Sequence, residues 1–176
     1  MEYRPATASD IDAIAGLHAD SWRRHYRGAY SDSYLDGDVA TERKEVWTDR
    51  LANPSPDAYT VVAALDGTIA GFAHTILDCD PTWGALLDNL HVRYDLKGSG
   101  VGTALMAETA RALLEGRPSS GLYLWVLEQN TSAQAFYEAR GGTRAGSEVG
   151  GPFPGGGTAL CFRFAWPDPS VLLATQ

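Results

Sequence analysis

Apolar residues follow two different spacings along the chain, one typical of helices and one typical of strands. Helical spacing over residues 10–25, 38–51 and 101–115 predicts three amphipathic helices. A fourth helix is predicted to open at Asn130 and to end at Gly141. Runs rich in β-branched and aromatic residues predict strands at 2–6, 59–65, 68–77, 83–92, 122–127, 143–148 and 158–166. This order predicts an α/β (α+β) fold with a mixed, mostly antiparallel sheet of six to seven strands and about four helices.

The connections between these elements predict how the strands pair. Asp66-Gly67 lies between two strand-like runs and is a hairpin signal, and Gly71 on the returning strand predicts a bulge or a close backbone approach. The strand 83–92, the helix 101–115 and the strand 122–127 form a βαβ unit, so the two strands should be parallel neighbours. We expect residues 1–176 to form a single domain, with 167–176 as a C-terminal tail.

Composition and charge narrow the class of protein. The chain is 44% hydrophobic and 20% charged, which is typical of a globular protein. Its net charge of −8 disfavours a nucleic-acid partner. No apolar run approaches the roughly 20 residues of a membrane helix, and the N-terminus does not resemble a secretion signal, so we expect a cytoplasmic protein without a membrane partner. Two isolated cysteines, Cys79 and Cys161, predict no metal site.

Three glycines stand at alternate positions between the strand ending at Val92 and the helix that follows. Gly98, Gly100 and Gly102 allow positive φ angles and a close approach of a ligand to the backbone. A helix N-terminus offers free N–H groups and the positive end of the helix dipole. The stretch therefore predicts a phosphate or diphosphate cradle.

Other phosphate cradles fit the stretch less well. No Gly-Lys pair exists, so a Walker-type loop is excluded. A dinucleotide fingerprint requires G-x-G-x-x-G at the end of a strand, and here the spacing is G-x-G-x-G, six positions after Val92. Glu128, at the end of the strand 122–127, resembles the acidic residue of that fingerprint. A nicotinamide-linked oxidoreductase therefore remains a distant alternative.

Two motifs resemble those of the GNAT family of N-acetyltransferases. The family's acyl-CoA motif is a strand ending in apolar-x-Val, then [Gln/Arg]-x-x-Gly-x-[Gly/Ala] and a helix. Its second motif is a strand followed by Asn, an Ala-containing helix start and an aromatic-Tyr pair. The matching residues are Leu90-His91-Val92, Lys97-Gly98-Ser99-Gly100-Val101-Gly102 and Thr103 for the first motif, and Asn130, Ala133 and Phe136-Tyr137 for the second. Lys97 stands where the family has Gln or Arg.

The resemblance implies direct transfer of acetyl from acetyl-CoA to a primary amine of a small molecule or a peptide, without a metal. It implies that acetyl-CoA binds along both motifs, including Tyr137. Asn130 would bond the pantetheine, cap the following helix, or do both. Tyr137 is the candidate general acid for the leaving thiolate, and the alternative for this residue is a tyrosine packed on a helix face. A non-catalytic acyl-CoA-binding module with the same fold is the second hypothesis.

Asp88 is the candidate general base for the attacking amine. It shares strand parity with Leu90 and Val92, whereas His91 should point the other way, and aspartate is rare in strands. An exposed or hydrogen-bonded aspartate is an equal alternative. Weaker candidates for the base are Asp78, Asp80, His74 and Glu128.

An aromatic series predicts the wall of the acceptor pocket. Trp22, Tyr26 and Tyr30 recur every four positions, and Tyr34 continues the series. They would line the substrate pocket together with the loop 150–157, or they would pack in the core, and the two readings are equally weighted. Exposed aromatic residues and the final strand make a homodimer plausible.

Overall fold

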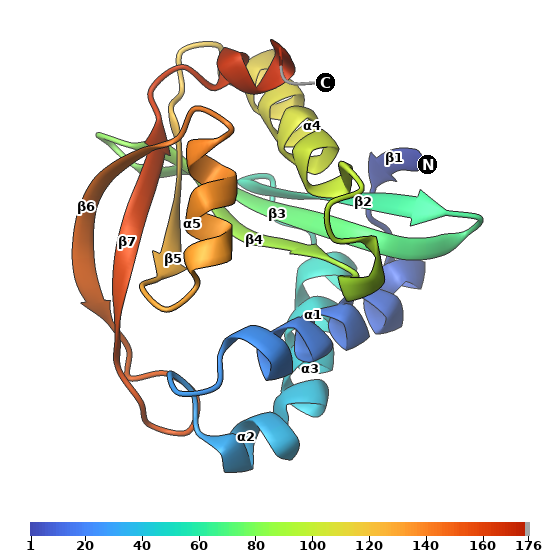
Figure 1. The fold of residues 1–176 in the computed structure, drawn as a ribbon. Helices are drawn as coiled ribbons and strands as arrows, with labels where there is room; N and C mark the ends of the chain where they lie inside the picture. Colours follow the sequence, from blue (N-terminus) through green and yellow to red (C-terminus); the bar gives the residue numbers. More distant parts are fainter. Residues whose placement is uncertain (175–176) are drawn as a thin grey trace.

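The computed structural model describes residues 1–174, which form a seven-stranded sheet with helices on both faces (Figure 1). The strands are β1 (Glu2–Pro5), β2 (Ala58–Leu65), β3 (Thr68–Asp80), β4 (Gly84–Val92), β5 (Leu122–Leu127), β6 (Thr143–Gly150) and β7 (Ala159–Trp166). The α-helices are α1 (Ile11–His25), α2 (Asp32–Asp36), α3 (Val39–Ala52), α4 (Val101–Gly116) and α5 (Thr131–Glu138). Short 3₁₀ helices are η1 (Ala8–Asp10), η2 (Tyr94–Leu96) and η3 (Pro169–Ala174). The predicted α+β fold with a mostly antiparallel sheet is confirmed.

The sheet has the strand order β1-β2-β3-β4-β5-β7-β6, and its neighbours are antiparallel except for β4 and β5. The predicted parallel pair of the βαβ unit is confirmed. Only two positions of these strands pair, Ala85 with Leu122 and Leu86 with Tyr123. Beyond them β4 and β5 diverge (Figure 1). This divergence opens the sheet at its centre.

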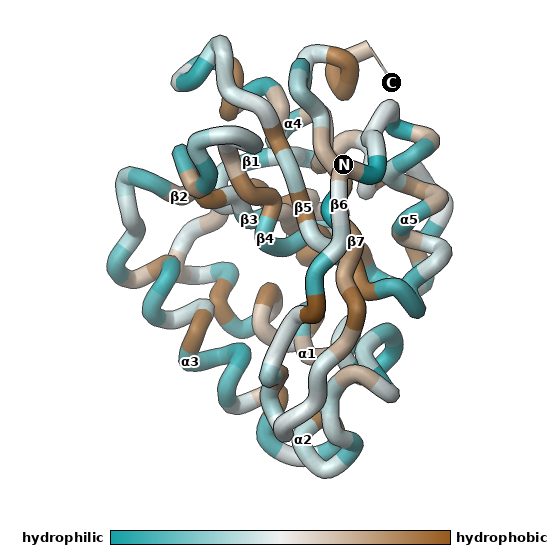
Figure 2. The backbone as a smooth tube through the Cα atoms, turned by 90° about the vertical axis from the view of Figure 1, so that its left-hand side faces the viewer, coloured by the Kyte–Doolittle hydropathy of each residue, from teal (hydrophilic) through white to brown (hydrophobic). Residues whose placement is uncertain are grey.

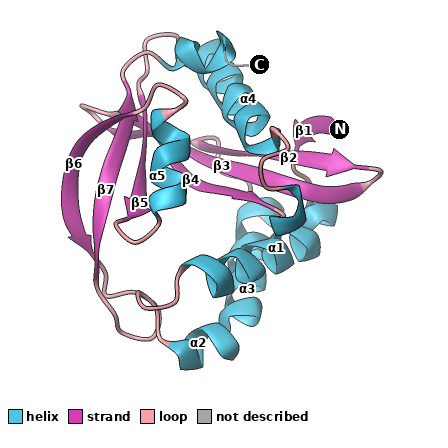
Figure 3. Cartoon of the chain, viewed as in Figure 1, coloured by secondary structure: helices cyan, strands magenta, loops and turns pink. Residues whose placement is uncertain are grey.

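Helices cover both faces of the sheet (Figure 3). Helices α4 and α5 lie on one face, and α1 and α3 lie on the other, under β1–β4. The main core lies between the sheet and α4, where Leu105, Met106 and Leu113 are fully buried against β4, β5 and β7. A second core packs Ile14 and Trp47 against Phe72. Figure 2 shows the corresponding contrast between hydrophobic central strands and the hydrophilic outer turns of α3.

Glycine positions agree with the predicted turns. Asp66 and Gly67 both have positive φ, at 50° and 77°, as expected for a two-residue hairpin. Gly71 lies opposite a register shift at Ala63/Ala64, and a Cβ on it would lie 2.9 Å from the His91 carbonyl oxygen. The predicted close backbone approach at Gly71 is therefore confirmed.

Two elements of the structure are absent from the predicted set. Helix α2 was not predicted, and the Ser31 side chain accepts from the Tyr34 amide and caps it. Within the predicted tail, Pro169–Ala174 form η3, whose Leu172 is buried in the core with α4. Asn130 caps helix α5, which is one of its predicted roles. Residues 175–176 of the predicted tail lie outside the described residues.

Candidate active site

A cavity of about 340 Å³ lies where β4 and β5 diverge. Its lining comes from the end of α1, from β4, from the glycine loop at the start of α4, from β5 and from α5. It contains most of the residues that the sequence predicted for acyl-CoA. These are Leu90, His91, Val92, Lys97, Gly98, Gly100, Gly102, Thr103, Asn130, Ala133 and Tyr137. The two exceptions are Ser99, whose hydroxyl donates to the Leu96 carbonyl, and Val101, whose side chain is buried in the core.

The glycine loop has the backbone geometry that the sequence predicted. Gly98 and Gly100 have φ of 83° and 88°, in the left-handed region, and Gly100 is the N-cap of α4. A Cβ on either residue would meet no atom within 4 Å. Glycine is therefore favoured by the positive φ angle and not by a lack of space. Gly102 differs, because a Cβ there would lie 3.4 Å from the Phe136 ring and would narrow the cavity wall. The loop therefore leaves open space above a helix N-terminus.

The amides at this helix start lack protein acceptors. The first amide of α4 that bonds back into the loop is that of Ala104, which donates to the Gly100 carbonyl at 3.0 Å. Within residues 1–174 the amides of Val101, Gly102 and Thr103 donate to no acceptor, as expected for the first turn of a helix. These amides, together with the helix dipole, favour an anion at this place.

Two cations flank the helix start. Lys97 lines the cavity at the end of the loop. Arg140, just beyond α5, also lines it, and its Nε donates to the Thr103 hydroxyl at 2.9 Å while its guanidinium lies over the Phe136 ring. No local sequence motif points to Arg140, because its contact with Thr103 joins residues 37 positions apart. The arginine fork suits the oxygens of a phosphate.

The edge of β4 that faces β5 has free backbone groups. The Arg93 amide donates to the Ala70 carbonyl of β3 at 2.9 Å. Because bonds to one neighbour alternate along an antiparallel strand, the amides of Leu90 and Val92 turn toward the gap. Opposite them, the Asn130 side-chain oxygen accepts from the Ala133 amide and caps α5, which leaves the Asn130 NH₂ group for a further acceptor.

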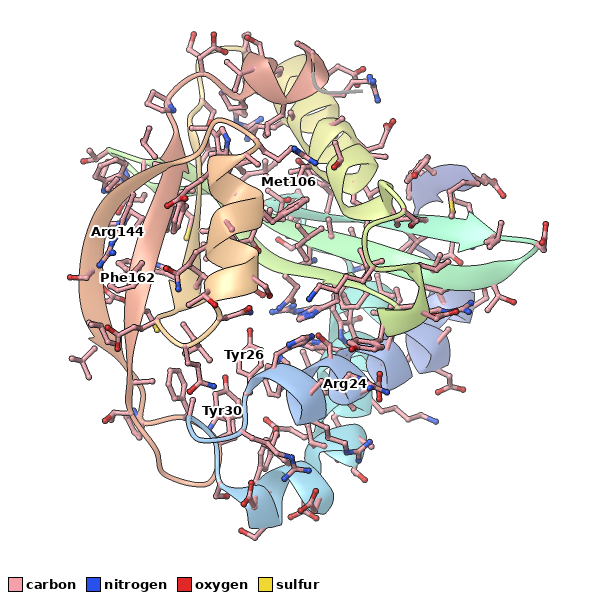
Figure 4. The ribbon with its side chains drawn as sticks, in the orientation of Figure 1. Arg24, Tyr26, Tyr30, Met106, Arg144 and Phe162 are labelled. Atoms are coloured by element: carbon pink, nitrogen blue, oxygen red, sulfur yellow. The ribbon has the colours of Figure 1, made fainter. Side chains whose placement is uncertain are left out.

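Two tyrosines converge in the cavity from different helices. Tyr137 of α5 packs near Phe136, Phe164 and Trp166, and its hydroxyl forms no hydrogen bond within residues 1–174. Burial, and then the Tyr26 phenol, raise the pKa of Tyr137. Tyr26 stands at the end of α1 and points toward the space between α5 and β4 (Figure 4). Burial and the nearby Asp88 carboxylate raise the pKa of Tyr26 to about 12. Both phenols are therefore protonated donors at neutral pH.

A bulge at Asp88 overturns the predicted strand parity. His74 of β3 pairs with Asn89, but the next residue, Thr75, pairs with Leu87, so Asp88 is the extra residue. The Asp88 carboxylate and the Asn89 amide oxygen both accept from one guanidinium, that of Arg50, at 2.8 Å each. Consecutive side chains of a regular strand point to opposite faces, so only the bulge permits this shared contact. Asp88 thus lies toward α3, away from Leu90 and Val92, although it still lines the cavity.

Strand alternation makes the gap between β4 and β5 a slot that passes through the sheet. Leu124 and Val126 of β5 pack in the core on the α4 face. Trp125 points to the other face, where it also lines the cavity. On that face His91 is buried, as its predicted direction required, and its Nδ1 lies 2.7 Å from the Ser21 hydroxyl of α1. The slot therefore has a glycine-loop side and an α1 side.

Neutral histidines lie in and beneath the α1 side of the slot. Burial lowers the pKa of His91 to about 3 and that of His74 to about 4. His18 is fully buried between Trp22, Trp47 and Phe72, accepts from Trp47 Nε1 at 3.0 Å, and has its pKa lowered by burial and by His91. Since these groups stay uncharged at neutral pH, they support the site by packing.

Of the predicted acceptor aromatics, only Tyr26 lines the cavity. Trp22 and Tyr30 are 8% and 9% exposed and belong to a core cluster with Ala19, Leu35 and Val39. The ring of Tyr30 stacks on Phe153 from the loop 150–157, at 4.8 Å between centroids. Trp22 and Tyr30 each pack against Tyr26, at 5.4 and 5.1 Å. They hold Tyr26 in place, so the core-packing reading fits these two residues.

The weaker base candidates lie outside the cavity lining, in structural contacts. His74 Nδ1 lies 2.8 Å from the Thr60 hydroxyl. Asp78 pairs with Arg117, and Asp80 accepts from the Thr82 and Trp83 amides in the β3–β4 turn. Glu128 is exposed at the end of β5. No sequence motif singled out several further cavity residues, among them Ser21, His25, Asn89, Trp125 and Arg140. Ser21 and His25 lie far from the glycine loop in the sequence, and Asn89 belongs to no motif although it follows Asp88 directly.

Two further features of the described residues concern metal ions and membranes. Among residues 1–174, no group of three or more His, Cys, Asp or Glu side chains is arranged to hold a metal ion. No helix in the described part of the chain combines the length and the apolar character needed to cross a membrane.

Comparison with known proteins places this geometry in a family. The model of the acetyltransferase (GNAT) family matches residues 19–142. The chain is 31% identical to the uncharacterized N-acetyltransferase YuaI of Bacillus subtilis, over 96% of this chain and 94% of that protein.

Solved structures share the fold at lower identity. The crystal structure of the PaiA N-acetyltransferase of Thermoplasma acidophilum in complex with coenzyme A superposes with a TM-score of 0.70 and 20% identity, covering 94% of this chain and 98% of that one. Arabidopsis thaliana NAA60 in complex with a bisubstrate analogue gives a TM-score of 0.68 and 18% identity, covering 94% and 96%. Such identities show a common fold.

Proposed function

The chain belongs to the acetyltransferase (GNAT) family and is an acetyl-CoA-dependent acetyltransferase, and from that premise we propose that it transfers acetyl directly to a primary amine of a small molecule or a peptide. One observation supports the proposal above all others. The slot between β4 and β5 joins a helix N-terminus with free amides to two protonated tyrosines. A diphosphate and an acyl-transfer centre can therefore be held in one continuous cavity.

The residues of the glycine-loop side fit coenzyme A. Free amides of 101–103, the open space above Gly98 and Gly100, and the cations Lys97 and Arg140 suit a diphosphate. The β5-facing edge of β4 suits an amide-containing pantetheine arm, which would pair with it as an added strand. Asn130 has a free NH₂ group for the same arm while its oxygen caps α5.

The chemistry then follows from three groups around the slot. An amide at Leu90 or Val92 would stabilise the oxyanion that develops on the thioester carbonyl, typically worth about 3 kcal/mol per donor. Tyr137 would donate its proton to the departing thiolate. The raised pKa of Tyr137 does not prevent this, because burial in the same slot also raises the proton affinity of a thiolate.

The amine must lose a proton before or during attack. Asp88 is the proposed acceptor, directly or through a water, from its place on the α1 side of the slot beside Tyr26. Its pair with Arg50 fixes the position of the carboxylate. An ammonium would also be attracted by this carboxylate on entry.

Two measurements test the proposal. First, thermal shift with coenzyme A, acetyl-CoA and NAD should show stabilisation by the two CoA compounds only, since a doubly wound parallel sheet is absent from residues 1–174. Second, release of the free thiol from acetyl-CoA should depend on an added amine from a broad panel. Binding of acetyl-CoA without turnover of any amine would instead support the non-catalytic module.

A further inference from the structure

Arg163, in the middle of β7, has no acidic partner although acidic residues outnumber basic ones by 22 to 14 in this chain. Within residues 1–174 its guanidinium forms no ion pair and no side-chain hydrogen bond, and its Nε is buried without an acceptor. Most other arginines of the chain bond to a carboxylate or a carbonyl. The buried Nε is closed to solvent, but the two terminal NH₂ groups donate to no acceptor within residues 1–174, so they are left for an acceptor from outside the chain.

Aromatic rings hold the Arg163 guanidinium in place. Its Cζ lies 4.5 Å from the ring centroid of Trp125, 4.7 Å from that of Trp83 and 6.0 Å from that of Tyr123. These rings pack near the guanidinium, whose terminal N–H groups lie in its plane and are used for hydrogen bonding. The group is thus oriented in advance, and a carboxylate can accept two parallel bonds from such a fork.

Arg163 lies next to the cavity but outside its lining, on the same face of the sheet as Trp125. It faces Trp125 in the β5–β7 ladder, and Trp125 lines the cavity. Neighbouring Phe162 and Phe164 pack in the core on the α4 face, so Arg163 points the other way. An acceptor that enters from this side would reach Asp88 and Tyr26 with one end and Arg163 with the other.

We propose that Arg163 binds a carboxylate of the acceptor, so that the acceptor class is an ω-amino carboxylate, a small molecule with an amine at one end and a carboxylate at the other. This rests on the proposed amine acetylation. The slot lies between β4 and β5, and Arg163 lies on the strand beyond β5, so two strand spacings give a separation of roughly 7–10 Å. A chain of about five to six carbons spans that distance.

The charges of Asp88 and Arg163 favour an acceptor that carries opposite charges at its two ends. Asp88 attracts the ammonium and Arg163 attracts the carboxylate, whereas a diamine would meet the guanidinium with its second cation. The aromatic faces around Arg163 are already covered by the guanidinium, so they offer no free cage for a cation. Charge placement therefore favours a zwitterion over a polyamine.

The test compares 6-aminohexanoate with hexylamine, which has the same amine and chain length but no carboxylate. The native enzyme should show a kcat/KM at least about 10-fold higher for 6-aminohexanoate. Arg163→Gln should remove this preference through KM, with hexylamine turnover within about two-fold of native. Arg163→Lys should keep part of the preference, since it keeps the charge but loses the fork.

Arg144→Gln is the matched control. Arg144 stacks on Phe162, the residue before Arg163 in β7 (Figure 4). Phe162 packs in the core on the α4 face, opposite to Arg163. This variant should keep the preference for 6-aminohexanoate. A native enzyme that acetylates both amines equally well, with the same ratio in Arg163→Gln, overturns the inference.

Binding of hexanoate to the CoA-loaded protein, followed by calorimetry, gives a readout that does not need turnover. Binding that is lost in Arg163→Gln and retained in Arg144→Gln supports the carboxylate site even if no amine is acetylated, in which case the proposed reaction alone fails. Absence of hexanoate binding to a native protein that turns over hexylamine overturns the site alone. Melting curves identify a variant that fails to fold. If Arg163→Gln fails to fold, Arg163→Lys is compared with the native enzyme instead.

Discussion

The two sides of the slot are built in opposite ways. The glycine-loop side comes mainly from one stretch, 97–103, with α5 beside it. The α1 side takes up to three residues each from α1 and its end, from β4 and from β5, and beyond the cavity Arg163 from β7. A contiguous stretch can encode a backbone cradle, because main-chain amides need only the right φ angles. A pocket of side chains requires that distant segments pack together.

This difference predicts different behaviour on mutation. On the glycine-loop side, changes in backbone conformation should matter most and should reduce coenzyme affinity. On the α1 side, changes in single side chains should alter the rate, the pH profile or the choice of acceptor while leaving coenzyme binding intact.

Tyr137, between the two sides, should give the largest effect. Tyr137→Phe removes the proposed proton donor but keeps the ring contacts with Phe164 and Trp166. We expect kcat to fall by about 100-fold or more, with the Kd for acetyl-CoA changed little. Steady-state kinetics and calorimetry measure the two quantities. Tyr26→Phe, which removes the second phenol, should have a smaller effect, and full kcat in Tyr137→Phe rules out the acid role.

Gly100 tests the backbone cradle. Gly100→Val places a β-branched residue at φ 88°, which costs about 1–3 kcal/mol unless the loop rearranges. Rearrangement should weaken coenzyme A binding at least about 10-fold, measured by calorimetry. Gly16→Ala is the control, because Gly16 lies in α1 without positive φ and a Cβ there meets no atom within 4 Å. That variant should bind normally, and equal affinity in Gly100→Val argues against the cradle.

Asp88 tests the proton acceptor on the α1 side. Asp88→Asn should lower kcat/KM at neutral pH by about 10-fold and flatten the acid limb of its pH profile, because an amide cannot take the proton. Asp78→Asn is the matched control, since Asp78 also pairs with an arginine, Arg117, at 2.8 Å but lies outside the cavity lining. A native-like pH profile in Asp88→Asn removes the assignment.

Lowering the pH should destabilise the α1 side before the glycine-loop side. The pKa values of His91 and His74 are lowered to about 3 and about 4 in the folded chain, against an ordinary 6.5 when unfolded. Above pH 6.5 both states are neutral and these groups add no pH dependence. Between pH 6.5 and 4 the unfolded chain binds the protons, so each group lowers the free energy of unfolding by up to about 1.4 kcal/mol per pH unit.

Urea denaturation at pH 7.5, 6 and 4.5 measures this slope, and His74→Gln should reduce it. Asp10, paired with Arg4, has its pKa lowered to about 2 and contributes only below about pH 4, so it does not interfere. Hydrogen exchange should rise in α1 and α3 before it rises in α4. Equal slopes in native protein and His74→Gln would contradict the prediction.

Sequence patterns predicted most of the helices and strands of the fold. The period-two and helical spacings located the seven strands and four of the five α-helices of residues 1–174, and the βαβ order gave the parallel pair. They missed α2, whose start depends on a single capping contact between Ser31 and Tyr34. They also missed η3, whose Leu172 is fixed by packing against α4 rather than by any local signal.

The candidate site also contains features that the local sequence determines and features that depend on tertiary packing. Glycine spacing alone determined the positive φ angles of Gly98 and Gly100, because few other residues adopt them at low cost. Only the tertiary structure decided where Asp88 points, since one bulge between β3 and β4 reverses the parity. It also decided that Tyr26 lines the slot while Trp22 and Tyr30 support it, and that Arg163 lies beside Trp125. Backbone conformation is a local property of the chain, whereas the neighbours of a side chain depend on how all the segments pack.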